Sequence, residues 1–401
     1  MLNRQPGLHR RSVWVLMYES LPLERAREFV REDSPAVTDG AEENKLAAGV
    51  HGLAAAKAEV TSQKAYTAFD DLDMRSAFFE QYLIQDARSG ATTADVLGGE
   101  ETVRTFQQLL TQHGFLMVNI VLGKTDPWAD IDAHPPLLKG FEHGANTIHI
   151  SLKSPSEQGE PLSERMVADS RLRDADLLWI DVRNGSSKQD SSWSELIAGE
   201  IAKLRHRFFG DLAEHPILIV SSLRGPARTV APPFIGGCEE SLIHVPLWID
   251  DGKGHARRLQ KLAGSFDLLP TLADYLKGEP VGESSRVPTD APVSGDKDAE
   301  SKDAATLAVG PQSLRPMLKE FDYESDRLLR LVGDGWSALR SQQYLLVSAE
   351  MQDQNAQTMD LGLDRRRLYL KPDDVWNVHD SIVTYEAVAD EMDAVWQQNG
   401  V

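Results

Sequence analysis

Five short apolar runs constrain the fold of this chain more than any other feature of its 401 residues. They are rich in Val, Ile and Leu and do not alternate cleanly with polar residues, which is typical of strands covered on both faces of a sheet. The runs are residues 13–17, 116–122, 176–182, 216–222 and 245–249. We expect them to be buried strands of one sheet.

Segments with helical periodicity separate these runs. Residues 101–113 place Val103, Phe106, Leu109 and Leu110 on one stripe, and Gly114 follows as the expected C-terminal cap. Residues 193–209 carry a second apolar stripe. Because strands alternate with helices, the sequence predicts an α/β fold with a mostly parallel central sheet flanked by helices.

The last quarter of the chain has a different pattern. Residues 336–340, 343–348 and 367–370 are typical of short antiparallel strands, and residues 384–397 of a terminal helix. Residues 279–304 contain no aromatic residue and no Leu, Ile or Met, so we expect a mobile surface loop there. The sequence thus predicts a core over residues 10–320 and a small carboxy-terminal α+β subdomain over residues 325–401.

The composition limits partners and location. The formal net charge is −20, which favours solubility and disfavours broad contact with nucleic acid or a membrane surface. The single cysteine, Cys238, excludes an intrachain disulfide, and we expect an inert thiol. The apolar run behind the basic first residues is shorter than the roughly 7–15 residues of a secretory signal. We therefore expect a cytoplasmic chain, unless an export signal is missing from this sequence.

Two neighbouring motifs point to a known fold. Residues 240–249 read Glu-Ser-Leu-Ile-His-Val-Pro-Leu-Trp-Ile, and residues 266–275 read Phe-Asp-Leu-Leu-Pro-Thr-Leu-Ala-Asp-Tyr. We expect Asp267 to cap a helix there and Pro270 to lie in its first turn. The pair resembles the Val-Pro-Leu strand and the Asp-Leu-Leu-Pro-Thr-Leu helix of the sulfatase and alkaline phosphatase superfamily.

Weaker matches occur in the right order on both sides of these motifs. Residues 15–21 resemble the first strand of the family, residues 110–124 its segment ending in Gly-Lys, and residues 219–225 its Thr-Ser-Asp-His-Gly loop. Residues 339–344 and 367–377 resemble its carboxy-terminal pattern. The resemblance extends over residues 12–395 and implies a hydrolase fold with a metal site.

The resemblance also shows which metal ligands are missing. Family members hold one or two divalent metals with aspartates, often with His or Asn. Here Tyr18 and Glu19 stand where the first strand of the family ends in aspartates. Leu223 and Arg224 stand where the family has the Asp-His pair, and Arg224 introduces a cation instead.

The nucleophile of the family is missing as well. The best placement of its Cys/Ser-x-Pro-x-Arg motif puts Asp71 at the nucleophile and Arg75 at the arginine, and formylglycine cannot form from Asp. The neighbouring acids Asp70, Asp71 and Asp73 would either gather a cation or favour the start of an apolar helix through its dipole.

The remaining pocket residues give a mixed picture. Lys124 matches the Gly-Lys lysine of the family, whereas Asp126 replaces the histidine that follows it, and residues 179–185 hold no substrate histidine. The scattered histidines fit structural or surface positions better than a zinc site.

We therefore interpret the chain as a sulfatase-like pseudoenzyme without catalytic residues, metal or cofactor, with a binding or structural role. Its remnant pocket comprises Glu19, Asp71, Arg75, Lys124, Asp126 and Arg224. A small anion such as sulfate or phosphate, or a protein partner in a homo- or hetero-dimer, are the candidate ligands. The other interpretation of Lys124, Arg224 and Arg75 is that each of these bases only pairs with a nearby Asp or Glu, which are abundant in this chain.

The alternative is an active, metal-dependent sulfate or phosphate ester hydrolase with a rearranged site. One geometric prediction accompanies the first interpretation: Arg224 lies within ion-pair distance of Glu19 or of an acid in residues 70–73.

Overall fold

The structure is a computed structural model. It describes residues 11–21, 68–88, 90–123, 147–153, 170–183, 191–209, 215–225, 240–253, 256–278, 310–320, 327–349, 366–372 and 379–398. Lys124, Asp126, Cys238 and the loop predicted at 279–304 lie outside these ranges.

A mixed sheet of eight strands forms the centre of the described part of the chain. Its order is β4-β3-β5-β1-β6-β7-β2-β8. The strands are β1 (Val13–Tyr18), β2 (Ala77–Leu83), β3 (Met117–Gly123), β4 (Thr147–Lys153), β5 (Leu177–Arg183), β6 (Ile217–Ser222), β7 (Leu247–Asp250) and β8 (Arg257–Gly264). All five predicted runs form strands of this sheet, so that prediction is confirmed.

Only β7 runs against its neighbours in this sheet. It pairs antiparallel with β6 and with β2, whereas all other pairs of strands are parallel. A connection between parallel strands needs a dozen or more residues, and far fewer separate β7 from β8. The short connection therefore leaves β7 pointing opposite to β8, and the sheet is mostly parallel.

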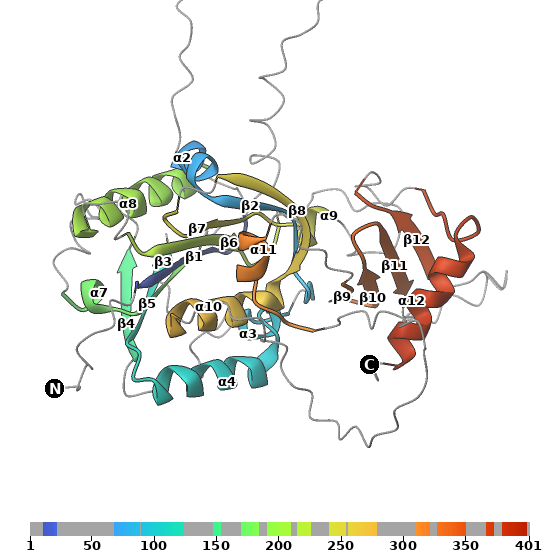
Figure 1. Cartoon of the computed structure of the whole chain (residues 1–401), viewed down its shortest axis with the longest axis horizontal. Coiled ribbons are helices and arrows are strands. Elements are labelled where there is room, and N and C mark those ends of the chain that lie inside the picture. The colour runs from blue at the N-terminus through green and yellow to red at the C-terminus, as the bar shows by residue number, and fades with distance from the viewer. Residues whose placement is uncertain are drawn as a thin grey trace, which may run out of the picture.

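Helices cover both faces of the sheet (Figure 1). The helices α2 (Ala68–Arg75) and α8 (Ser191–Phe209) lie on one face, and α4 (Gly99–Gln112) and α10 (Leu268–Lys277) on the other. The side chains of β1 alternate between the two cores that result. Val13, Val15 and Met17 belong to the core under α4 and α10, and Trp14, Leu16 and Tyr18 to the core under α8. This two-sided burial explains the absence of polar alternation in the sequence.

Within the described ranges, four short helices join these elements: α3 (Thr93–Val96), α7 (Ser170–Asp174), α9 (Glu240–Ile243) and α11 (Arg315–Lys319). The one-turn 3₁₀ helix η3 (Ser265–Asp267) precedes α10. Helix α4 ends as predicted, because Gly114 takes a positive φ of 64° directly after the C-cap His113.

The predicted role of the acids at residues 70–73 needs correction. We expected them to precede an apolar helix, but they lie inside α2, and the apolar residues that follow form strand β2. Nearly every residue of β2 is buried, since the strand lies between β7 and β8 with both faces covered. A short apolar run without alternation does not distinguish a strand from a buried helix, which explains the error.

A second, antiparallel sheet lies near the carboxy terminus. Its order is β12-β11-β10-β9, with β9 (Leu329–Gly333), β10 (Trp336–Arg340), β11 (Tyr344–Ala349) and β12 (Arg366–Leu370). Helix α12 (Glu386–Gln398) buries Ala389 and Met392 against Leu346 and Leu368. The α/β fold with a small carboxy-terminal α+β part is confirmed, although β9 was not predicted. None of the helices in the described ranges is both long and apolar enough to span a membrane.

Candidate functional site

The carboxyl ends of the central parallel strands bring two predicted site residues together. Strand β1 lies between β5 and β6, and its last residue, Tyr18, is in register with Val182 and Ser222. Glu19 follows β1 directly, and Arg224 lies two residues beyond β6. Because all three strands run in the same direction, both side chains emerge at one edge of the sheet.

The hydroxyl of Ser222 holds the backbone at this edge. The group is buried, accepts hydrogen bonds from the amides of Leu21 (3.0 Å) and Arg224 (3.4 Å), and donates to the carbonyl of Arg224 (2.5 Å). The amide of Leu223 also donates to the carbonyl of Tyr18 (2.8 Å). Hydrogen bonds therefore connect the segment after β1 to the segment after β6 independently of the side chains of Glu19 and Arg224.

Arg224 and Glu19 form the predicted ion pair. Nη2 of Arg224 lies 2.8 Å from Oε1 of Glu19, and the side chains are 49% and 28% exposed. A carboxylate already bonded to a guanidinium does not fit a divalent cation, which needs several converging oxygen ligands. Across the described ranges, no group of three or more His, Cys, Asp or Glu residues is arranged to hold a metal ion.

The acids of α2 are only partly described. Asp73 accepts hydrogen bonds from the indole of Trp248 (2.6 Å) and from Arg258 (3.2 Å), so it joins α2 to β7 and β8. The backbones of Asp70 and Asp71 belong to α2, but their side chains lie outside the described part of the structure. Lys124 and Asp126 lie outside it entirely.

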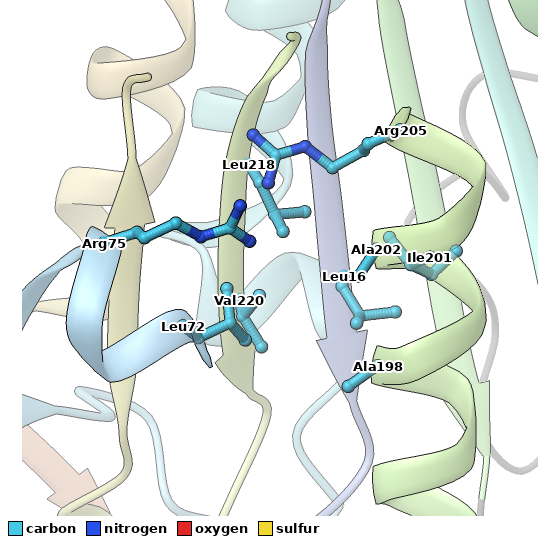
Figure 2. Close-up of a pocket in the computed structure, with 9 residues that line it drawn as sticks. All are labelled: Leu16, Leu72, Arg75, Ala198, Ile201, Ala202, Arg205, Leu218 and Val220. Carbon is cyan, nitrogen blue, oxygen red and sulfur yellow. The ribbon is translucent and has the colours of Figure 1, made fainter. Parts of the chain in front are cut away.

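Arg75 does not lie at the same edge of the sheet as Arg224, because it lies two residues before the amino end of β2. It lines a cavity with Arg205 of α8 and Leu218 of β6, and Figure 2 shows the two guanidinium groups reaching toward each other. Leu218 precedes Ser222 by four residues, or about 13 Å along the strand. Strands β2 and β6 are both antiparallel to β7 and therefore run in the same direction, so the amino end of β2, next to Arg75, and the carboxyl end of β6, next to Arg224, belong to opposite edges of the sheet.

Three buried ion pairs in the described ranges were not predicted, one of them between Lys371 and Glu240. Arg205 donates to Asp250 (2.8 Å), and Arg327 donates to both carboxylate oxygens of Asp267 (2.6 and 2.7 Å). The sequence predicted that the side chain of Asp267 caps α10, but it makes no capping hydrogen bond to that helix. Besides Arg327, the carboxylate accepts a hydrogen bond from the amide of Gly264 (2.7 Å). Arg205 follows Ile201 by four residues and therefore lies on the same buried face of α8. This spacing in the sequence could have indicated a buried arginine that needs an acidic partner.

Among the described histidines, His244 is held by contacts within the fold. His215 and His244 are buried and His206 is exposed. Nδ1 of His244 lies 3.4 Å from Glu240, and Nε2 contacts the carbonyl of Glu80 at 2.5 Å. These contacts agree with structural positions.

No protein-family model matches the sequence, and no curated protein matches it significantly. Solved structures do match over nearly the whole chain. A protein of Bacteroides thetaiotaomicron from work on the metabolism of multiple glycosaminoglycans matches with a TM-score of 0.54 at 12% identity, over 98% of this chain and 99% of its own. A protein in complex with its substrate D-glucosamine-2-N,6-O-disulfate matches with a TM-score of 0.53 at 10% identity, over 97% and 96% of the two chains.

The phosphonate monoester hydrolase of Silicibacter pomeroyi matches with a TM-score of 0.50 at 11% identity, over 97% of this chain and 94% of its own. At such identities the likeness concerns the fold. The chain shares the sulfatase and alkaline phosphatase fold, and the fold that the sequence resemblance implied is confirmed.

Proposed function

We propose that this chain is a sulfatase-like pseudoenzyme that keeps the hydrolase fold for a binding or structural role. The ion pair between Glu19 and Arg224 is the observation that carries the proposal. In family members the corresponding strand ends line the metal site. Here a guanidinium and a carboxylate neutralise each other at that edge.

The chemistry of these residues supports the proposal. A divalent metal in a hydrolase polarises the ester and lowers the pKa of a bound water. A guanidinium supplies positive charge and hydrogen-bond donors but has no coordination site for a water or an ester oxygen. The carboxylate of Asp71, at the position matched to the nucleophile, also cannot become a formylglycine.

Arg224 offers the means for a binding role. Its side chain is half exposed, and a guanidinium forms parallel hydrogen bonds with sulfate and phosphate oxygens. An anion at this edge would compete with Glu19 for the same donors. A small oxyanion is therefore the ligand we propose for this edge, and a protein partner that presents a carboxylate or a phosphate would use the same donors.

The test of inactivity is a turnover assay with the purified chain. Sulfate, phosphate and phosphonate monoesters are offered with Mg²⁺, Ca²⁺, Mn²⁺ or Zn²⁺, since the similar structures include a phosphonate monoester hydrolase and a protein with a disulfated substrate. We expect no turnover. Activity that disappears in both the Asp71→Ala and the Glu19→Ala variants would instead establish a hydrolase with a rearranged site, because a contaminating enzyme would ignore both changes.

The binding role is tested separately by titrating sulfate and phosphate against the intact chain in a calorimeter. We expect weak binding that is lost in Arg224→Gln and kept in Arg104→Gln. Arg104 is a matched control, because it also forms an exposed ion pair of 2.8 Å, with Glu101 on α4. Equal binding by both variants would exclude Arg224 as the anion ligand.

A further inference from the structure

The ion pair of Glu19 and Arg224 uses only part of the guanidinium. Nη2 of Arg224 donates to Oε1 of Glu19 at 2.8 Å, and in the described ranges this is the one hydrogen bond of the guanidinium group. A guanidinium carries its N–H groups in a planar fork and pairs best with a carboxylate through two parallel hydrogen bonds. The pair here has a single bond, so donors of the half-exposed Arg224 stay available for a further acceptor.

The backbone amides of this edge are engaged within the protein. Hydrogen bonds of 2.8–3.4 Å to other protein atoms are made by the amides of Glu19, Leu21, Leu223, Arg224 and Gly225. Consecutive backbone N–H groups form an anion site only where they converge on one free point. An anion at this edge therefore depends on side chains, above all on the guanidinium of Arg224.

The fold holds the carboxylate of Glu19 next to this guanidinium. The amide of Glu19 donates to the carbonyl of Val182 at 2.8 Å, directly after a strand that is paired on both sides. Arg224 lies in the segment whose backbone is bonded to the hydroxyl of Ser222. Because both backbones are fixed, the carboxylate has a high effective concentration at the guanidinium. A free anion thus meets an acceptor that cannot diffuse away.

The charge of Glu19 strengthens this competition. The formal net charge of the chain is −20, which already opposes the approach of an anion. At the edge, the carboxylate of Glu19 neutralises the guanidinium of Arg224. A neutral ion pair attracts sulfate less than a free guanidinium would.

We propose that Glu19 is a built-in competitor that regulates anion binding at Arg224. Its carboxylate occupies Nη2 in place of a ligand oxygen, so an oxyanion gains the full fork of donors only by displacing Glu19. The inference rests on the proposed binding role at this edge and adds the group that controls it.

Replacing the carboxylate by a neutral group of the same shape tests the inference. Sulfate is titrated in a calorimeter against the unaltered chain and Glu19→Gln, with sodium chloride keeping the ionic strength constant. We expect Glu19→Gln to bind sulfate roughly two- to fivefold more tightly, because the ligand no longer has to break an exposed ion pair. The gain should vanish when Arg224→Gln is added to Glu19→Gln.

Glu101→Gln is the matched control, because it also removes one negative charge from an exposed pair of 2.8 Å, with Arg104. We expect it to bind sulfate like the unaltered chain. An equal gain in Glu101→Gln would overturn the proposal, since net charge alone would then explain the effect. Unchanged affinity in Glu19→Gln would overturn it as well and leave the binding role intact. Absence of sulfate binding in every chain would reject the binding role and the inference together.

Crystals of the unaltered chain grown in sulfate give a test without a variant. We expect a sulfate oxygen at Nη2 of Arg224 and the carboxylate of Glu19 turned away from it. Sulfate bound beside an intact ion pair, or absent from Arg224, would contradict the displacement.

Discussion

At the scale of single residues, the exposure of a charged group decides what its ion pair contributes. Arg224 and Glu19 are 2.8 Å apart and partly exposed to water, whereas Arg327 and Asp267 are almost completely buried at similar distances. An exposed pair contributes about 0–1 kcal/mol, since solvent screens the attraction and the side chains lose conformational freedom. The same contact distance thus describes two very different interactions.

We therefore expect Arg224→Ala to lower the free energy of unfolding by less than about 1 kcal/mol. Urea unfolding measures the change, with Arg104→Ala as a control for an exposed pair. A loss of several kcal/mol would show that the guanidinium supports the edge through more than this ion pair. The small effect expected here makes Arg224 variants suitable for binding assays, because they should fold normally.

At the scale of elements, Asp267 joins parts of the chain that are far apart in sequence. Its carboxylate accepts from the amide of Gly264 at the end of β8, from the amide of Gln312 and from Arg327 shortly before β9. It also directly precedes α10. The aspartate of the Asp-Leu-Leu-Pro-Thr-Leu motif thus fixes where the chain returns to the core after α10.

We expect Asp267→Asn to destabilise the fold by about 3–5 kcal/mol, because the buried Arg327 would lose the opposite charge that compensates its burial. Urea unfolding of this variant is compared with Glu101→Gln, which breaks an exposed pair and should have little effect. If the two variants are equally stable, the buried pair does not have the structural importance assigned to it.

At the scale of the whole molecule, the two sheets share a core. Leu83 and Leu262 of the central sheet pack with Leu331 and Trp336 of the carboxy-terminal sheet. A buried ion pair reinforces this contact: Nζ of Lys371, next to β12, lies 2.7 Å from Glu240 of α9. These contacts connect the predicted core to the predicted subdomain, and the boundary between them stays a prediction.

The ion pair of Glu240 makes the stability of the whole molecule depend on pH. Burial alone would raise the pKa of Glu240, but the hydrogen bond with His244 and the charges of Lys371 and Arg340 outweigh burial and hold the pKa well below its ordinary value of 4.5. Because the folded-state pKa is lowered, the ionised group stabilises the fold at neutral pH. That contribution is lost as the pH falls below the pKa of Glu240 in the unfolded state and approaches its lower pKa in the folded state.

We expect the difference in unfolding free energy between the unaltered chain and Glu240→Gln to be constant above about pH 6 and to narrow from about pH 5 to 3. Urea unfolding at each pH measures it. A difference that stays constant down to pH 3 would contradict the lowered pKa.

The sequence by itself determined the fold class and the alternation of strands and helices along the chain. Residues 13–17 and 216–222 predicted strands because they are apolar on both sides, and β1 indeed contributes to both cores. The Val-Pro-Leu and Asp-Leu-Leu-Pro-Thr-Leu motifs predicted the superfamily fold. The pairing of Glu19 with Arg224 was also predictable, because the carboxyl ends of neighbouring parallel strands meet at one edge.

Only the tertiary structure decided which charged side chains lie next to each other. Strand β2 was not predicted, since a short apolar run fits a strand or a buried helix, and without its direction Arg75 could not be assigned to the amino edge. The partners of Asp267 and Glu240 lie 60 and 131 residues away. Periodicity and capping patterns describe neighbours within a few residues, whereas buried ion pairs form wherever packing brings charges together without water.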